Sequence, residues 1–121
     1  TTLEYLKSRK QFDTVLAQFQ AIQHRMSDLF CQIELVRSVV EHAARTVDGD
    51  APDRTEAAIM AKSMANDLAN LMTRQMVQLH GGIGMTDLHD AGLYLKRARA
   101  LEALFGNTAW QNERFAQLHR Y

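Results

Sequence analysis

The segment of this chain most suited to bind a ligand is a glycine cluster that directly follows a long helical pattern. Residues 78–84 read Gln-Leu-His-Gly-Gly-Ile-Gly, so an amide and an imidazole stand close before three glycines. Glycine has no Cβ, which lets the backbone turn sharply and lets a phosphate approach the backbone N–H groups. The usual dinucleotide-binding turn follows a strand, whereas here a helix comes first. Taken alone, the glycines favour a helix C-terminal cap with a tight loop.

A second candidate segment lies near the start of the chain, where Arg9 and Gln11 precede Phe12. The planar guanidinium of an arginine can hold a phosphate through two parallel hydrogen bonds. A single arginine is nevertheless most often a solvated surface charge. The neighbouring Asp13-Thr14 pair is typical of a turn. We therefore predict a break in the helical pattern over 12–16.

Other reactive side chains lack a spacing that indicates chemistry. His24 and Asp28 share a helix face, and histidines and aspartates gather within 80–90, but neither group matches a known metal-ligand pattern. We predict no metal site. The single Cys31 lies in an apolar helical pattern without an activating base, which predicts a buried small residue and no catalytic thiol. The basic run 96–99 is expected to be solvated, with a contact to an acidic partner or a CoA phosphate as the alternative.

The composition limits the kinds of protein this can be. With 121 residues, 46% apolar side chains and one proline, the chain suits a single helical domain. The formal net charge of zero argues against a nucleic-acid partner. The chain contains neither an apolar run of about 18 residues nor a signal-peptide pattern, so we expect no membrane partner and a cytoplasmic location.

Helices must position these candidate residues, because apolar side chains recur every three or four residues along most of the chain. We expect the end of a helix over 1–10, long helices over 17–47 and 52–79, and shorter ones over 88–104 and 109–118. Pro52 marks the start of the second long helix, and Thr108 with Gln111 predicts a capping box for the last one. No strand pattern is present. The predicted fold is all-α, an antiparallel up-and-down helical bundle of one domain, 1–121.

The long helices carry apolar faces too wide for the chain itself to cover. Such faces make an incomplete bundle, so we expect a fragment or excised domain that associates. Its partner would be the helix that ends in 1–10 or another chain, as a homo-oligomer (dimer or tetramer) or a heteromer. The alternative is a self-sufficient small bundle, whose core would be marginal for its size.

Taken together and in order, the segments 9–12, 19–22 and 78–86 make the chain similar to the C-terminal helical domain of the acyl-CoA dehydrogenases. Those flavoproteins desaturate acyl-CoA thioesters. The similarity runs from about Leu3 to Leu118. It implies that one segment lies against the adenosine and pyrophosphate part of FAD, namely Gln78, Leu79, His80, Gly81 and Gly82.

The resemblance also implies a role for the first segment. Arg9, Gln11 and Phe12 match a family turn whose arginine pairs with the pyrophosphate of an FAD bound mainly by a neighbouring subunit. Phe19 and Gln20 match the next pair of residues that contact the cofactor. The family usually has glycine where this chain has Asp13. A carboxylate there would repel the pyrophosphate, so Asp13 must point away or the site is weakened.

A larger departure concerns the catalytic base. The family removes the α-proton of the thioester with a glutamate while the β-hydrogen leaves as hydride to the flavin. In many members that glutamate belongs to a Tyr-Glu-Gly-Thr motif, and counting from Gly81 without gaps places Phe105 at its position. Glu102, one helical turn earlier, is a weaker candidate that is more simply a solvated carboxylate. Some members carry the base on the helix that would precede residue 1, and some heteromers contain one subunit without a base.

The resemblance thus implies the C-terminal domain of an FAD-dependent acyl-CoA dehydrogenase, inactive in isolation, that supplies FAD contacts and the oligomer interface. Its substrate would be a fatty or steroid acyl-CoA, and its electron acceptor an electron-transferring flavoprotein. One alternative is a non-catalytic FAD-binding partner subunit of a heteromeric dehydrogenase, which Phe105 favours. The other is a plain helical interaction module.

Overall fold

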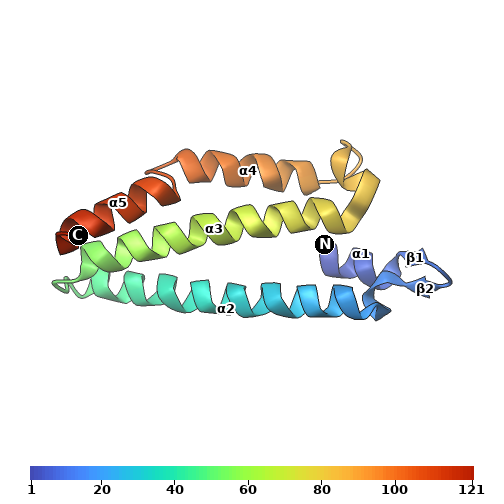
Figure 1. Cartoon of the computed structure of the whole chain (residues 1–121), viewed down its shortest axis with the longest axis horizontal. Helices are drawn as coiled ribbons and strands as arrows, with labels where there is room; N and C mark the ends of the chain where they lie inside the picture. Colours follow the sequence, from blue (N-terminus) through green and yellow to red (C-terminus); the bar gives the residue numbers. More distant parts are fainter.

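Helices dominate the computed structural model, which describes all 121 residues. They are α1 (Thr2–Ser8), α2 (Gln20–Asp48), α3 (Arg54–His80), α4 (Ala91–Ala103) and α5 (Thr108–His119). Figure 1 shows α3 in the middle, with α2 running antiparallel on one side and α4 followed by α5 on the other. The predicted all-α, up-and-down bundle is confirmed. No helix combines the length and the apolar character that crossing a membrane requires.

Both long helices begin two or three residues later than predicted. The segment Leu16–Gln18 forms a short 3-10 helix, η1, and Phe19 after it has extended backbone, so α2 begins at Gln20. Pro52 lies in the turn before α3, whose N-terminal cap position is Asp53. Periodicity locates a helix well but its ends poorly, because a helical face repeats only every three or four residues.

The predicted capping box at the start of α5 is wrong. The cap is Asn107, whose Oδ1 accepts a hydrogen bond from the Trp110 backbone N–H at 2.9 Å. Thr108 is the first helical residue, and its hydroxyl donates instead to Asp67 of α3 at 2.7 Å. Asparagine and threonine are both good caps, so the sequence alone does not distinguish two adjacent candidates.

The predicted break contains a small hairpin that no sequence pattern indicates. β1 (Lys10–Gln11) pairs antiparallel with β2 (Thr14–Val15). Phe12 and Asp13 turn between them with φ angles of 53° and 62°. Two consecutive left-handed residues suit a tight hairpin turn. Strands of two residues are too short for the alternating pattern by which strands are recognised.

Small side chains form the contact between α2 and α3. Ala43 of α2 packs with Ala57 and Ala61 of α3, and Val39 covers them. Only 14 of 121 residues are buried, while large apolar side chains such as Phe30 and Leu35 stay exposed. The wide apolar faces predicted from the sequence are therefore uncovered within this chain.

Cys31 is exposed, which contradicts the prediction that it is buried. It lies two residues after the buried Leu29. Two helical residues correspond to a rotation of about 200°, so Cys31 is on the far side of α2 from that inward-facing side chain.

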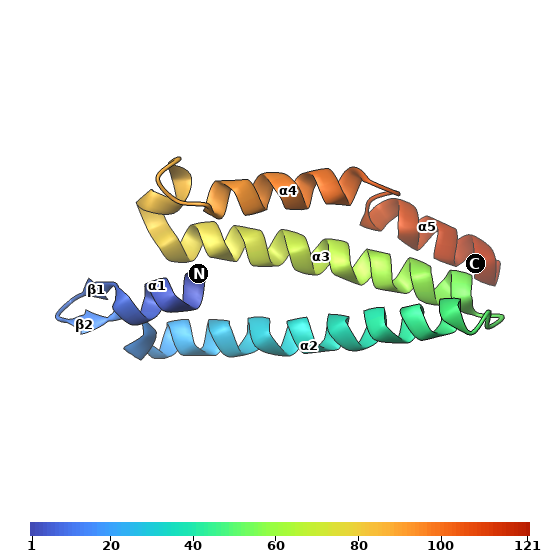
Figure 2. The same ribbon diagram turned by 180° about the vertical axis from the view of Figure 1, so that it is seen from behind.

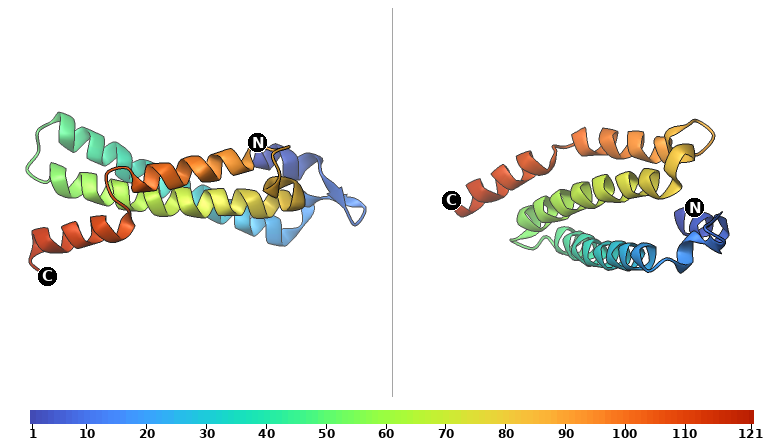
Figure 3. Two further views of the ribbon diagram at one scale, coloured as in Figure 1. Left: turned by 90° about the horizontal axis from the view of Figure 1, so that it is seen from above. Right: turned by 45° about the vertical axis from the view of Figure 1, so that its right-hand side comes forward.

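The two ends of the bundle differ in what they present. Figure 2 shows that one end carries the hairpin, the last turn of α3 and the 3-10 helix η2 (Gly81–Met85). The other end carries the loop between α2 and α3 and the C-terminus. The right-hand view of Figure 3 shows α4 and α5 on the side of α3 away from α2. The segments predicted to bind a cofactor, 9–20 and 78–82, are thus at one end.

Two glycines provide a matched test of this packing. A Cβ built on Gly84 would lie 2.8 Å from the Val77 carbonyl oxygen and 2.9 Å from the His80 Cβ, whereas one on Gly92 meets nothing within 4 Å. Gly84→Ala should lower the free energy of unfolding by about 1–3 kcal/mol, because backbone cannot move aside easily. Gly92→Ala, in the first turn of α4, should raise it by up to about 1 kcal/mol. Thermal unfolding followed by circular dichroism measures both, and equal effects would contradict the packing at η2.

Candidate functional site

The predicted cofactor segment at the end of α3 offers one exposed side chain before its glycines. Gln78 is exposed on the last turn of the helix. Leu79 and His80 are buried, with exposed fractions of 7% and 3%. A ligand at this end could therefore meet the side chain of Gln78 but only the backbone of the next two residues.

The His80 ring anchors this segment to the rest of the fold. Its Nδ1 lies 2.7 Å from the Met76 carbonyl oxygen, and its ring centroid lies 3.9 Å from that of His89 and 4.5 Å from that of Tyr5. The Tyr5 hydroxyl donates to the His80 carbonyl oxygen at 3.3 Å. These contacts tie the start of the glycine turn to α1. No group of three or more metal-ligating side chains comes together in this chain.

The first two glycines leave their backbone open to solvent. Gly81 has φ 64° and ψ −141°, a conformation that residues with a Cβ rarely adopt. A Cβ built on Gly81 or Gly82 would meet nothing within 4 Å, and both residues are exposed. The local backbone explains why Gly81 is a glycine, while the open space around both leaves room for a ligand.

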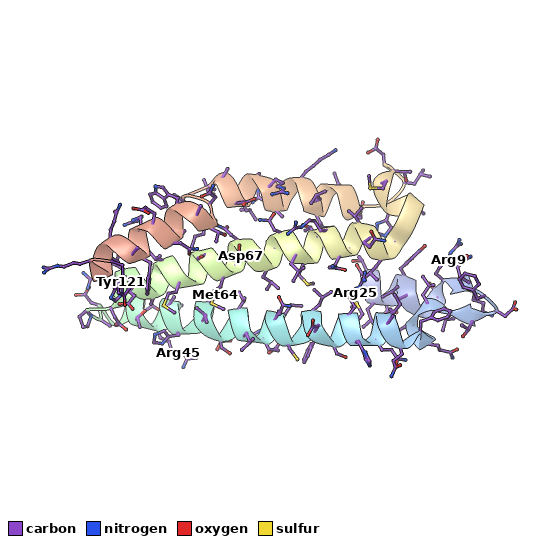
Figure 4. All side chains as sticks on the ribbon, viewed as in Figure 1. Arg9, Arg25, Arg45, Met64, Asp67 and Tyr121 are labelled. Atoms are coloured by element: carbon purple, nitrogen blue, oxygen red, sulfur yellow. The ribbon has the colours of Figure 1, made fainter.

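The first segment lies at the same end and presents a cation and an aromatic ring. Arg9 ends α1 with extended backbone, and its carbonyl oxygen accepts from the Leu16 N–H at 2.9 Å. Its side chain is exposed, and Figure 4 shows it on the hairpin end, opposite Arg45. Phe12 is 87% exposed at the tip of the hairpin, and its ring meets the Phe19 ring edge-on with centroids 6.3 Å apart.

These groups fit the part of a dinucleotide that carries phosphates and a nucleoside. Arg9 supplies a guanidinium for an anion, and Gly81 and Gly82 supply accessible backbone. Gln78 supplies an amide that can pair with a nucleobase or ribose. Asp13 is exposed in the same hairpin turn, so a carboxylate accompanies the cation there. Gln11 and Gln20 are exposed nearby on β1 and at the start of α2.

The turn after α4 forms a second region of interest, because it contains Phe105. Phe105 and Gly106 have φ angles of 61° and 95°. The Gln111 side chain donates to the Phe105 carbonyl oxygen at 2.7 Å, and that of Asn66 donates to the Gly106 carbonyl oxygen at 3.2 Å. Lys62 donates to the Leu101 carbonyl oxygen at 2.8 Å. Side chains from α3 and α5 therefore hold this turn.

Glu102, the weaker candidate for a base, is committed to neighbours. The largest effect on its pKa is a hydrogen bond with the Asn70 side chain, which lowers the pKa of the Glu102 carboxyl. An ion pair with Arg99 at 3.0 Å lowers that pKa further. A carboxylate with a lowered pKa is a weaker general base. The geometry argues against a catalytic role for Glu102.

An open cavity of about 440 Å³ adjoins Phe105 between α3, α5 and the end of α2. Its apolar lining comes from Val47, Ala58, Ile59 and Phe105, and its polar lining consists of Arg54, Thr55, Lys62, Gln111 and Arg114. Three of these side chains are cations, and none is a carboxylate. The cavity can accept an apolar group near Phe105 and a negatively charged or polar group beside the cations.

The sequence interpretation missed the polar side chains of α3. Asn66 and Asn70 are buried, and Lys62 precedes them at the same spacing of four residues. A spacing of four keeps side chains on one helix face. This row of polar side chains on one face of an alanine-rich helix was visible in the sequence and could have indicated a polar contact between helices. Polar groups in such a row require partners, and here the partners lie around the turn after α4.

Comparison with known proteins gives a consistent result. The family model described as "Acyl-CoA dehydrogenase, C-terminal domain" matches residues 1–118. Acyl-CoA dehydrogenase IpdE2 of Mycobacterium tuberculosis is 43% identical over 97 residues, which are 80% of this chain and 29% of that protein. The Mycolicibacterium smegmatis protein of the same name is 39% identical over 105 residues, 87% of this chain and 32% of its own length.

A solved structure shares the arrangement of the helices. Butyryl-CoA dehydrogenase from Megasphaera elsdenii superposes with a TM-score of 0.91 at 28% identity, over 99% of this chain and 31% of that one. The chain therefore spans about a third of the length of the relatives it matches.

Glu102→Gln should change the dependence of stability on pH. A pKa lowered on folding from its ordinary value of 4.5 means that the ionised carboxylate stabilises the fold above that value. This contribution is lost as the pH falls through the lowered pKa. The variant should thus be less stable than the wild type near neutral pH, and the two should converge in acid. Urea unfolding over a pH series measures this, with the exposed Glu113→Gln as control, and a difference that persists in acid would contradict the assignment.

Proposed function

The chain belongs to the acyl-CoA dehydrogenase family as its C-terminal helical domain, and on this premise we propose that it serves an FAD-dependent enzyme that desaturates acyl-CoA thioesters. The observation that carries the proposal is that the matched segments lie at the same end of the bundle. Arg9, Gln78 and the open backbone of Gly81 and Gly82 are exposed there together. They are the types of group that the adenosine and pyrophosphate of FAD require.

Each matched residue has a distinct proposed role. The Arg9 guanidinium binds the pyrophosphate, and the Gln78 amide binds the adenosine. Phe12 and Phe19 provide apolar contacts, while Gln11 and Gln20 provide amide groups beside them. Leu79 and His80 hold the glycine turn in place from inside the fold, because their side chains are buried. Bound FAD would supply the acceptor for the hydride that leaves the β-carbon of the thioester.

The positions of the two regions support an oligomer. Lys62, which contacts the end of α4, precedes Gly81 by 19 residues of α3 (81 − 62), or about 28 Å at 1.5 Å per residue. We assign the hairpin end to an FAD held mainly by a neighbouring subunit, and the Phe105 turn to the chain's own substrate region. Exposed apolar side chains on α2 such as Phe30 and Leu35 are available for contacts with further protein. We therefore propose a homo-oligomer (dimer or tetramer), with an electron-transferring flavoprotein as the electron acceptor.

A second candidate function follows from Phe105. A phenyl ring cannot accept the α-proton, and the Glu102 carboxylate forms an ion pair with Arg99. The base must then lie elsewhere in the complete polypeptide, or the chain belongs to a non-catalytic FAD-binding partner subunit of a heteromeric dehydrogenase. Residues beyond this domain decide between the two, since the domain covers about a third of its relatives.

Arg9→Ala should weaken FAD binding by the complete polypeptide. Loss of a charge-assisted hydrogen bond costs about 1.5–3 kcal/mol, or about 10- to 150-fold in the dissociation constant. Arg9→Lys should be intermediate, because it keeps the charge but loses the planar fork. Arg45→Ala is the control, since Arg45 is an exposed arginine at the opposite end, paired with Glu41. Titration of FAD into the apoprotein measures all three, and an unchanged constant for Arg9→Ala would contradict the assignment.

Anaerobic mixing with an acyl-CoA tests the reaction. A complete desaturase should lose its oxidised-flavin absorbance when mixed alone with a matched acyl-CoA, and Glu102→Gln should leave that rate unchanged. A base-less partner subunit should bind FAD but react only together with its catalytic partner. If the protein binds neither FAD nor acyl-CoA, the remaining hypothesis is a plain helical interaction module. Bleaching abolished by Glu102→Gln, with acyl-CoA binding intact, would make Glu102 the base.

A further inference from the structure

The turn after α4 takes little support from its own backbone. The Gly106 N–H reaches the Ala103 carbonyl oxygen only at 3.4 Å. The carbonyl groups of Phe105 and Gly106 instead accept from side chains of two other helices, Gln111 on α5 and Asn66 on α3. The conformation of the turn therefore depends on tertiary contacts.

Lys62 completes this arrangement from α3. Its ammonium group donates to the Leu101 carbonyl oxygen at 2.8 Å and to the Asn66 Oδ1 at 2.6 Å. The Leu101 carbonyl belongs to the last turn of α4, where carbonyl groups lack helical partners and the helix dipole favours a cation. Lys62 thus caps α4 and orients the amide of Asn66 towards Gly106. We refer to Lys62, Asn66 and Gln111 as the carbonyl clamp.

Phenylalanine at residue 105, the position that the clamp holds, is unfavourable for the stability of the domain. Its φ of 61° is in the left-handed region, which costs a residue with a Cβ about 1–2 kcal/mol. The side chain is 79% exposed, so burial within the domain does not offset that cost. Glycine or asparagine would suit the same backbone better. Stability of this domain does not explain a phenylalanine here, whereas contact with a ligand in the adjoining cavity does.

We infer that the carbonyl clamp is a set of positioning residues that keeps residue 105 left-handed, so that the Phe105 ring faces the acyl group and sets which acyl-CoA is accepted. This inference rests on the proposed function. Phe105 lines the cavity together with the apolar Val47, Ala58 and Ile59, and two clamp residues, Lys62 and Gln111, line it as well. If the clamp is broken, residue 105 can relax to a right-handed backbone, and its side chain direction changes with it.

The test compares clamp and side-chain variants of the complete, FAD-loaded polypeptide. Lys62→Met keeps the length of the side chain but removes the ammonium group, and Gln111→Met does the same for the amide. Phe105→Leu changes only the ring. Lys7→Met, which removes the charge of an exposed lysine of α1, is the matched control. Hydrogen exchange at the Gly106 amide, which bonds the Ala103 carbonyl oxygen, reports on the turn. Dissociation constants for short- and long-chain 2-enoyl-CoA products, which cannot reduce the flavin, report on selectivity.

Lys62→Met and Gln111→Met should each raise exchange at the Gly106 amide by about tenfold, the effect of one lost hydrogen bond to a charged or buried group. Both should also change the ratio of the two dissociation constants. Phe105→Leu should change that ratio by about tenfold while the turn stays protected. Lys7→Met should change neither quantity. If Lys62→Met does not fold, Gln111→Met decides the question by itself.

Three outcomes would overturn the inference in different ways. Exchange that stays at the wild-type level in both clamp variants would show that the clamp does not hold the turn, while the proposed function would stand. Equal weakening of both products, with the ratio unchanged in every variant, would reduce the clamp to a structural role. Absence of any 2-enoyl-CoA binding by the FAD-loaded wild type would overturn the proposed function itself, and the role of Phe105 with it.

Discussion

The packing of α3 is the constraint on which the rest of this domain depends. Its alanines, Ala57 and Ala61, lie against Ala43 of α2, and side chains this small allow the two helices to approach closely. Its polar residues Lys62 and Asn66 point instead to the end of α4. Figure 4 shows Met64 on the side of α3 towards α2, while Asp67 bonds Thr108 at the start of α5. Helix α3 thus packs against α2 through apolar side chains and bonds the end of α4 and the start of α5 through polar ones.

The hairpin end depends on a different kind of contact, between aromatic rings and a buried imidazole. Burial of a polar group is unfavourable unless its atoms are bonded, and the Nε2 of His80 has no partner within the chain. Packing against Tyr5 and His89, together with the bond from Nδ1 to Met76, offsets that cost. The result is that α1, and with it Arg9, is tied to the glycine turn although the two are 72 residues apart in the sequence (81 − 9).

The sequence predicted what depends on local periodicity and missed what depends on contacts between helices. Helix types and order follow from apolar spacing, and the candidate cofactor segments from residue types at matching positions. The hairpin tip at Phe12 and the left-handed Phe105 could not be predicted, because propensity disfavours a left-handed phenylalanine. The pairing of two very short strands holds the first turn, and side chains of α3 and α5 hold the second. Cys31 was misplaced because an apolar neighbourhood in the sequence is not one face of a helix. The clamp was missed although its spacing of four was visible.

The charges around Phe105 explain why an apolar residue suits that position in this chain. The cavity that it lines contains Arg54, Lys62 and Arg114 and no carboxylate. A nearby cation favours the ionised form of an acid and lowers its pKa. A glutamate at residue 105 would therefore be held ionised but would be a weaker acceptor for the α-proton. This environment tolerates an aromatic ring, stabilises negative charge in a ligand, and does not favour a base at 105. If the complete polypeptide carries out the proposed desaturation, a carboxylate placed away from these cations would be the stronger base.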